Sequence, residues 1–160
     1  MIREILFKAK RIDNGEWVEG SYYKQDYFYG DEVEKHIIIT SSDALTNDFD
    51  LDFYEVIPET LCEFTGRYDK NGKRIWENDI VHLTDVRYDA EWRAIVEFGN
   101  PYGEYTWGWN FYHIGAKAKV NTDILLWAEM EDVGVYCEVI GNHFDNHELL
   151  TAERSDYENQ

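Results

Sequence analysis

Apolar and polar residues alternate along much of this chain with a period of two. In the first run, Ile5, Phe7 and Ala9 lie on one face, and the same spacing returns over residues 94–98. Successive side chains of a β-strand point to opposite faces, so this period predicts strands with one apolar face. No long stretch follows the 3.6-residue period of a helix. The pattern therefore predicts an all-β protein.

Turn residues divide these runs into hairpins. Asp13-Asn14-Gly15 predicts a hairpin over residues 3–23, with its return strand beginning near Trp17. A second hairpin is predicted at Asp69-Lys70-Asn71-Gly72-Lys73, between two strand-like runs. Asn-Gly favours a two-residue type I′ turn, in which both residues have positive φ. We expect Asn71 and Gly72 to adopt that conformation.

The last part of the chain predicts a strand and a short helix, while residues 123–129 fit either a strand or a short helix. Residues 133–140 form the strand, and Asn142 to Leu150 indicates a turn leading into a short helix with Asn146 as its N-cap. The acidic tail, residues 151–160, is expected to be frayed.

These elements predict a β-sheet lobe at the N-terminus packed on a small SH3-like β-barrel, with a short C-terminal helix. We expect a single domain over residues 1–150, with lobes of about 1–59 and 60–150. The side chains expected to be largely buried are Trp17, Ile75, Trp76 and Ile80.

The central motifs of the sequence resemble those of the YopX family of phage and prophage proteins. The similarity is carried by Thr65-Gly66, by the turn from Asp69 to Lys73 and by Asn78-Asp79-Ile80-Val81. Further matching segments are Arg3–Ala9, Trp17–Gly20, Pro58–Thr60, Val139–Asn142 and Glu148–Leu150. The resemblance covers nearly the whole chain and implies a family with no settled biochemical activity. Asn78 stands where the family usually has Gly, which Asn can replace because it also reaches the left-handed region.

Acidic residues dominate the charge of the chain, which is −18. Residues 1–60 hold six basic and fourteen acidic side chains, residues 61–100 six and eight, and residues 101–160 three and eleven. Such a surface disfavours ordinary nucleic-acid binding, which needs Lys and Arg to displace counterions. Acidity of this kind either keeps the protein in solution or offers a surface to a basic partner, as a mimic of nucleic acid would.

The acidic segment before residue 53 supplies the candidate partner-binding residues. They are Asp48, Asp50 and Asp52. If the acidity forms a partner surface, carboxylates from residues 43–52 and 123–138 should converge on one face.

The two cysteines and the lengths of the apolar runs indicate where in the cell the protein is located. Cys62 and Cys137 lie far apart in strand-like settings, which indicates two reduced, buried thiols. No run approaches the roughly 18 apolar residues of a membrane span. The first residues, Met1 to Glu4, do not begin like a signal peptide. We expect a protein of the host bacterium's cytoplasm that does not associate with membranes.

Four side chains near the C-terminus have the types and spacing of a metal site. They are His143, Asp145, His147 and Glu148. On a helix, His-x-x-x-His presents two imidazoles on one face, as zinc requires. The zincin order is absent, however, and Gly141 and Asn142 favour a turn. The family resemblance also shows no His at these two positions. We therefore expect a surface turn, with no metal and no cofactor.

Two other clusters have structural interpretations. Tyr105, Trp107, Trp109 and Phe111 alternate as a stacking platform for bases would, but no Lys or Arg accompanies them. We expect them to form the core face of a sheet. The basic cluster from Lys70 to Arg74 lacks the pattern of a phosphate-binding loop and is expected to be a solvated hairpin tip.

Together these observations favour a non-enzymatic protein-interaction module with an acidic surface, for which we expect no catalytic residues. Its partner would be a host or phage protein, and homo-oligomers are possible. Two alternatives stay open. One is a nucleic-acid-associated SH3-like module or DNA mimic, by analogy of fold. The other is a metal-dependent hydrolase using residues 143–148.

Overall fold

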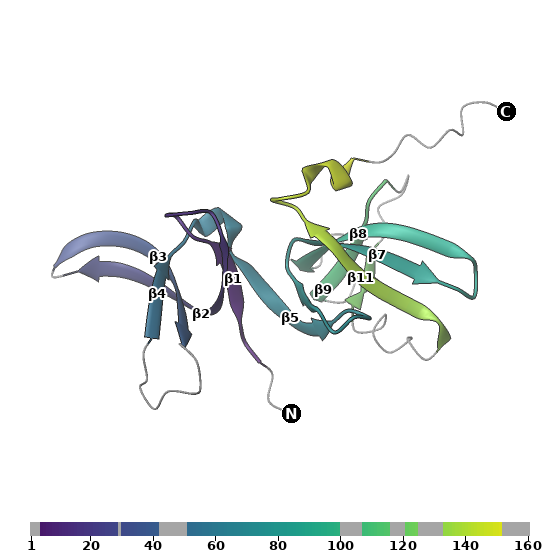
Figure 1. Cartoon of the computed structure of the whole chain (residues 1–160), viewed down its shortest axis with the longest axis horizontal. Coiled ribbons are helices and arrows are strands. Elements are labelled where there is room, and N and C mark those ends of the chain that lie inside the picture. Colours follow the sequence, from purple (N-terminus) through teal and green to yellow (C-terminus); the bar gives the residue numbers. More distant parts are fainter. Residues whose placement is uncertain are drawn as a thin grey trace. The chain divides into compact units, whose positions relative to one another are not determined.

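The computed structural model describes residues 4–28, 30–41, 51–99, 107–115, 121–124 and 133–151. Its described elements are strands and short 3-10 turns, which confirms the predicted all-β class (Figure 1). The chain divides into two compact units, Met1–Gly66 and Arg67–Gln160. No helix among the described residues is long and apolar enough to cross a membrane.

The first unit contains a meander of antiparallel strands. The strands are β1 (Phe7–Lys10), β2 (Trp17–Phe28), β3 (Asp31–Ser41), β4 (Leu51–Glu55) and β5 (Cys62–Tyr68), with the 3-10 turn η1 (Pro58–Thr60) before β5, whose last two residues belong to the second unit. Together with β6 of the second unit they follow the order β4-β3-β2-β1-β5-β6. Phe7 pairs with Gly20 and Lys10 with Trp17, so the predicted hairpin over residues 3–23 is confirmed.

The meander closes around its own small core. Val56 donates its N–H to the carbonyl of His36 on β3, and Ile57 donates to the carbonyl of Lys10 on β1. The segment that follows β4 is therefore bonded to both β3 and β1. Val56 is buried together with Ala9 and Ile38.

A glycine allows two strands of this unit to approach closely. A Cβ added at Gly20 on β2 would lie 2.2 Å from the carbonyl oxygen of Ile39 on β3. Real Cβ atoms do not tolerate that distance, so the local geometry of β2 and β3 depends on glycine at this position.

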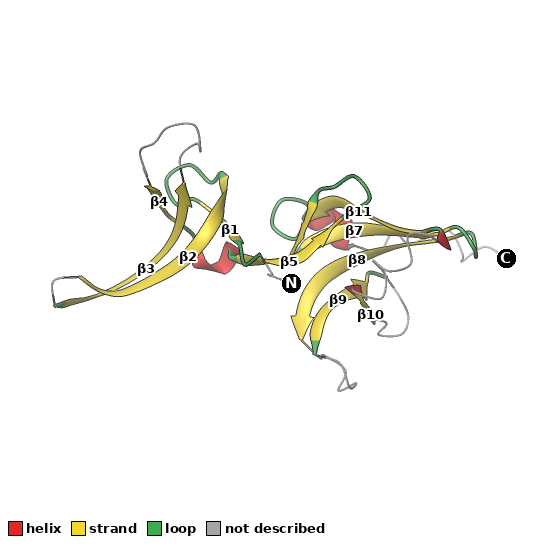
Figure 2. Cartoon of the chain, turned by 90° about the horizontal axis from the view of Figure 1, so that it is seen from below, coloured by secondary structure: helices red, strands yellow, loops and turns green. Residues whose placement is uncertain are grey.

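The second unit contains a five-stranded antiparallel sheet (Figure 2). Its strands are β7 (Asp79–Asp85), β8 (Ala90–Gly99), β9 (Gly108–His113), β10 (Asn121–Asp123) and β11 (Val135–Asn142), and the short strand β6 (Arg74–Trp76) precedes them in the chain. The sheet order is β10-β9-β8-β7-β11, and no pairing among the described residues joins β10 to β11. The buried core consists of Ile75, Val81, Leu83, Ala94, Val96, Trp109, Phe111, Ile124, Val135 and Cys137.

The central hairpin turns differently from the prediction. Asp69 N–H donates to Lys73 O, and Gly72 N–H donates to Asp69 O, so three residues form the turn. Gly72 has φ of 77°, whereas Asn71 does not have positive φ, so the prediction of a two-residue turn was wrong. The physical reason is the carboxylate of Asp69, whose Oδ1 accepts the N–H groups of Asn71 and Lys73. It favours a three-residue loop with glycine in the left-handed position.

Most of the predicted burial is confirmed. Ile75, Trp76 and Ile80 are at most 3% exposed. Trp17 is only half-buried, because its ring packs beneath the ammonium groups of Lys8 and Lys10 instead of entering the core. Both cysteines are buried and free, as expected.

The predicted C-terminal helix is a single 3-10 turn, η3 (His147–Leu150). Asn146 makes no side-chain cap bond there. The preceding turn is instead organised by Asn142, whose side-chain oxygen accepts the N–H groups of Phe144 and Asp145. The acidic tail from residue 152 lies outside the described residues.

Candidate functional site

Strands β2, β3 and β4 present apolar side chains on the face opposite to the core. Tyr23 lies opposite Ile37, and Ile39 lies opposite Phe53. Leu51 is 52% exposed and Phe53 62% exposed, while the two isoleucines are half-buried. We call these five residues (Tyr23, Ile37, Ile39, Leu51 and Phe53) the outer apolar face.

The sheet register shows why these side chains face outward. The adjacent row, Tyr22, Ile38 and Tyr54, packs into the core of the first unit. Neighbouring residues of a strand point to opposite faces, so Ile37 and Ile39 must point away from that core. Grouped apolar side chains exposed in this way are typical of interaction sites.

A recess of about 240 Å³ lies beside this face, at the end of β4. It is lined by Arg11, Ile12, Asp13, Phe53, Tyr54 and Glu55. Ile12 and Phe53 are both more than half exposed, so the recess combines apolar and charged surface.

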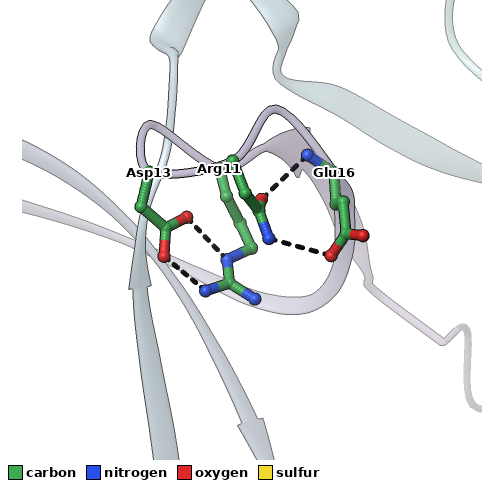
Figure 3. Close-up of polar contacts among 4 residues, drawn as sticks. Arg11, Asp13 and Glu16 are labelled. Atoms are coloured by element: carbon green, nitrogen blue, oxygen red, sulfur yellow. Dashed lines mark hydrogen bonds and ion pairs between the residues drawn. The ribbon is translucent and has the colours of Figure 1, made fainter.

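The charged wall of the recess is a tightly bonded turn between β1 and β2 (Figure 3). Arg11 Nε donates to Asp13 Oδ1 at 2.9 Å, and its guanidinium lies 4.3 Å from the ring centre of Tyr54. Asn14 donates from its side chain to the Glu16 carboxylate and accepts the Glu16 N–H. The hydrogen bond from Arg11 lowers the pKa of Asp13, and the same bond raises the pKa of Arg11. The turn therefore keeps its ion pair over a wide pH range.

Carboxylates outnumber cations around the recess. Asp13 and Glu55 line it with Arg11. Lys35 pairs with Glu55 at 3.0 Å. Both nearby cations are therefore already in ion pairs, Arg11 with Asp13 and Lys35 with Glu55.

The acidic residues predicted as a partner surface are only partly described. Asp52 is exposed on β4 and lies between Leu51 and Phe53 in sequence, so its side chain points to the face opposite the outer apolar face. Asp48 and Asp50 lie outside the described residues, as do residues 43–50 of the first acidic segment and 125–132 of the second, so the predicted convergence stays a prediction.

Sequence reasoning did not identify the outer apolar face. The available signal was the unbroken run from Ile37 to Ile39. Three consecutive isoleucines in a strand place apolar side chains on both faces, and a small unit can bury only one of them.

The suspected metal-binding residues form a turn. The rings of His143 and His147 are 6.1 Å apart, and the Asp145 carboxylate accepts a hydrogen bond from the Asn142 side chain. Among the described residues, no group of three His, Cys, Asp or Glu side chains is arranged to hold a metal ion. The geometry therefore gives the hydrolase alternative no support.

The aromatic ladder is divided between core and surface. Trp109 and Phe111 are buried in the core of the second unit, as expected. Trp107 is 77% exposed, so the expectation was wrong for this residue, which lies just before β9 begins. Tyr105 lies outside the described residues.

A comparison with known families gives one match over most of the chain. The family model described as YopX protein matches residues 6–151. This range includes the closed meander of the first unit, the outer apolar face and the sheet of the second unit. Among curated proteins, none matches the sequence.

Proposed function

Because this chain belongs to the YopX family, we propose that it is a phage or prophage protein that acts by binding another protein and catalyses no reaction. The proposed binding surface is the outer apolar face together with the adjoining recess. The observation that carries this proposal is the exposure of Leu51 and Phe53 on a strand whose opposite side packs into the core.

Two features of this surface support binding over catalysis. Apolar side chains exposed on a regular sheet lose unfavourable contact with water when a partner covers them. The recess beside them is lined by an ion-paired Arg11 and Asp13, and its lining includes no Ser, Cys or His as a nucleophile or base. Such a recess suits recognition of a side chain.

The proposal also covers the second unit and the compartment. We place the second unit among small SH3-like barrels, with support from its five consecutive antiparallel strands around one core. The host bacterium's cytoplasm is the proposed location, with support from two free, buried thiols. The carboxylates of Asp13 and Glu55 at the recess would favour a basic partner.

The proposal is tested with two matched variants in affinity capture from the host bacterium. Phe53→Asn removes the most exposed side chain of the outer apolar face. Tyr88→Asn removes an aromatic residue that is 75% exposed on the second unit. Quantitative mass spectrometry should find one host or phage protein captured by the natural chain and by Tyr88→Asn, and strongly depleted with Phe53→Asn.

Two results would contradict the proposal. One is equal capture by both variants, which would remove the outer apolar face from the interaction. The other is capture of nucleic acid that weakens steeply with salt, which would favour the nucleic-acid-associated module.

A further inference from the structure

Strand β4 ends the sheet, and part of its outer edge is open. In the described part of the chain it pairs along its length with β3 alone. Only its last residue is bonded on the other side, where Glu55 O accepts the N–H of Ile12 at 3.0 Å. Main-chain hydrogen bonding between β4 and the turn thus stops at Glu55.

The direction of the remaining backbone groups follows from two hydrogen bonds. Val56 N–H points to β3, where it bonds His36 O, while Glu55 O points away from β3. Backbone groups of an antiparallel strand alternate in direction from one residue to the next. Leu51 and Phe53 therefore direct both N–H and C=O outward, and no described residue bonds them on that side.

From this geometry we propose that β4 accepts an extended, basic segment of another protein as an added strand, paired with Leu51 and Phe53. The inference rests on the proposed function and specifies its partner and binding mode. Main-chain hydrogen bonds would supply affinity, as in other cases of strand addition. Alternate side chains of the segment would pack beside Leu51 and Phe53 and extend the outer apolar face.

The charge of the site selects the occupant. Residues 51–55 contain Asp52 and Glu55 and no basic residue. A Lys or Arg side chain of the added strand can place its aliphatic stem against Ile12 and Phe53 in the recess, with its charge near Asp13 and Glu55. A second copy of this chain, itself carrying a charge of −18, would be repelled from the same edge.

The experiment uses the full chain and a defined probe, an acetylated and amidated octapeptide of alternating lysine and valine. Two control peptides are the glutamate–valine counterpart and a lysine–valine peptide N-methylated at every residue, which cannot donate main-chain hydrogen bonds. Amide hydrogen exchange measured by NMR should slow at Leu51 and Phe53 with the lysine–valine peptide only. The amide of Tyr54, which already faces β3, is the internal reference.

Paired substitutions isolate the backbone donor. Phe53→Ser removes the side chain and keeps the N–H, whereas Phe53→Pro removes both without disturbing a bond to β3. The proline variant should bind the lysine–valine peptide roughly five-fold more weakly than the serine variant, the effect of one main-chain hydrogen bond. Slow exchange at the Ile38 amide shows that each variant is folded. If the Phe53→Pro variant is not folded, Leu51→Pro and Leu51→Ser provide the same comparison.

Three results would overturn strand addition. They are equal binding of the N-methylated peptide, equal affinity of the proline and serine variants, and protection of Leu51 and Phe53 that rises with protein concentration alone, which would indicate a second copy. If the first or second occurs while Phe53→Asn still loses the captured partner, the proposed function stands and only this binding mode fails.

Discussion

The side-chain carboxylate of Asp69 accepts a hydrogen bond from the main-chain N–H of Val139, at 3.0 Å and across 70 residues of sequence. Its other oxygen accepts the N–H groups of Asn71 and Lys73. One buried carboxylate thus shapes the central turn and joins it to β11. Lys70 adds a main-chain bond to Cys137 O on the same strand.

Replacing Asp69 by Ala should destabilise the second unit by about 3 kcal/mol, because buried N–H groups lose a charged acceptor. Urea unfolding followed by tryptophan fluorescence measures the change. Glu138→Gln is the matched control, since Glu138 forms a half-exposed ion pair with Lys70 at the same junction. Solvent screens that pair, so its removal should change the free energy of unfolding much less than removal of Asp69 does. Equal effects of the two substitutions would show that Asp69 has no special role.

Gly20→Ala should destabilise the first unit by about 3 kcal/mol or more, because the new Cβ would lie 2.2 Å from a backbone oxygen of β3. Gly108→Ala provides the control, because a Cβ at that position of β9 meets nothing within 4 Å. Its effect on the free energy of unfolding should be close to zero or slightly stabilising. Thermal unfolding of the two variants compares them directly, and a well-tolerated Gly20→Ala would refute the close approach of β2 and β3.

The alternation of apolar residues predicted strands and, in part, their faces. It placed Ala94 and Val96 in the core correctly, because their neighbours in the sheet cover them. It could not place Phe98, which lies on the same face and is exposed near the end of β8. Burial at a strand end depends on what packs over it, and local spacing carries no such information.

The central turn shows a second limit. Asn-Gly predicted the position of the hairpin correctly and its type wrongly. The deciding group is the Asp69 side chain, which bonds two N–H groups of the turn and one of β11. A contact across 70 residues cannot be read from a dipeptide. The outer apolar face was missed for a similar reason, because the register of three strands determines which isoleucines face outward.

Acid should destabilise the second unit partly through Asp85. Arg87 donates to this carboxylate from its side chain and its backbone N–H, and the side-chain hydrogen bond lowers the pKa of Asp85. A carboxyl whose pKa is lower when folded stabilises the fold above its unfolded pKa of about 3.9. That stability disappears as the pH falls through the folded value, so the expected window lies at and below about pH 4.

Unfolding experiments across this window, with Asp85→Asn, test the assignment. The variant should lose part of the pH dependence below about pH 4 and be less stable than the natural chain at neutral pH. Asp89→Asn, an exposed neighbour, serves as the control and should leave the acid limb unchanged. If the stability of Asp85→Asn falls with pH below about pH 4 as steeply as that of the natural chain, the Asp85 carboxyl is not a source of this pH dependence.

The last prediction concerns the acidic residues around β4. It tests whether they only keep the protein in solution or form a surface that binds a partner. Replacing Asp48, Asp50 and Asp52 by Asn should slow association with the lysine–valine peptide. The negative carboxylates attract the positively charged peptide as it approaches, and the variant lacks that attraction. Stopped-flow fluorescence measures the association rate. The difference from the natural chain should shrink as salt increases, since screening reduces the Debye length to about 8 Å at physiological ionic strength.

A matched neutralisation tests whether position matters more than total charge. Asp89, Glu91 and Glu148 are exposed carboxylates of the second unit, and changing them to Asn, Gln and Gln removes the same total charge. If the carboxylates before and within β4 direct the encounter, this second triple variant should associate at nearly the rate of the natural chain. Equal slowing by both triple variants would mean that overall charge alone governs association. An unchanged rate in the first variant would leave these three aspartates with no part in partner binding.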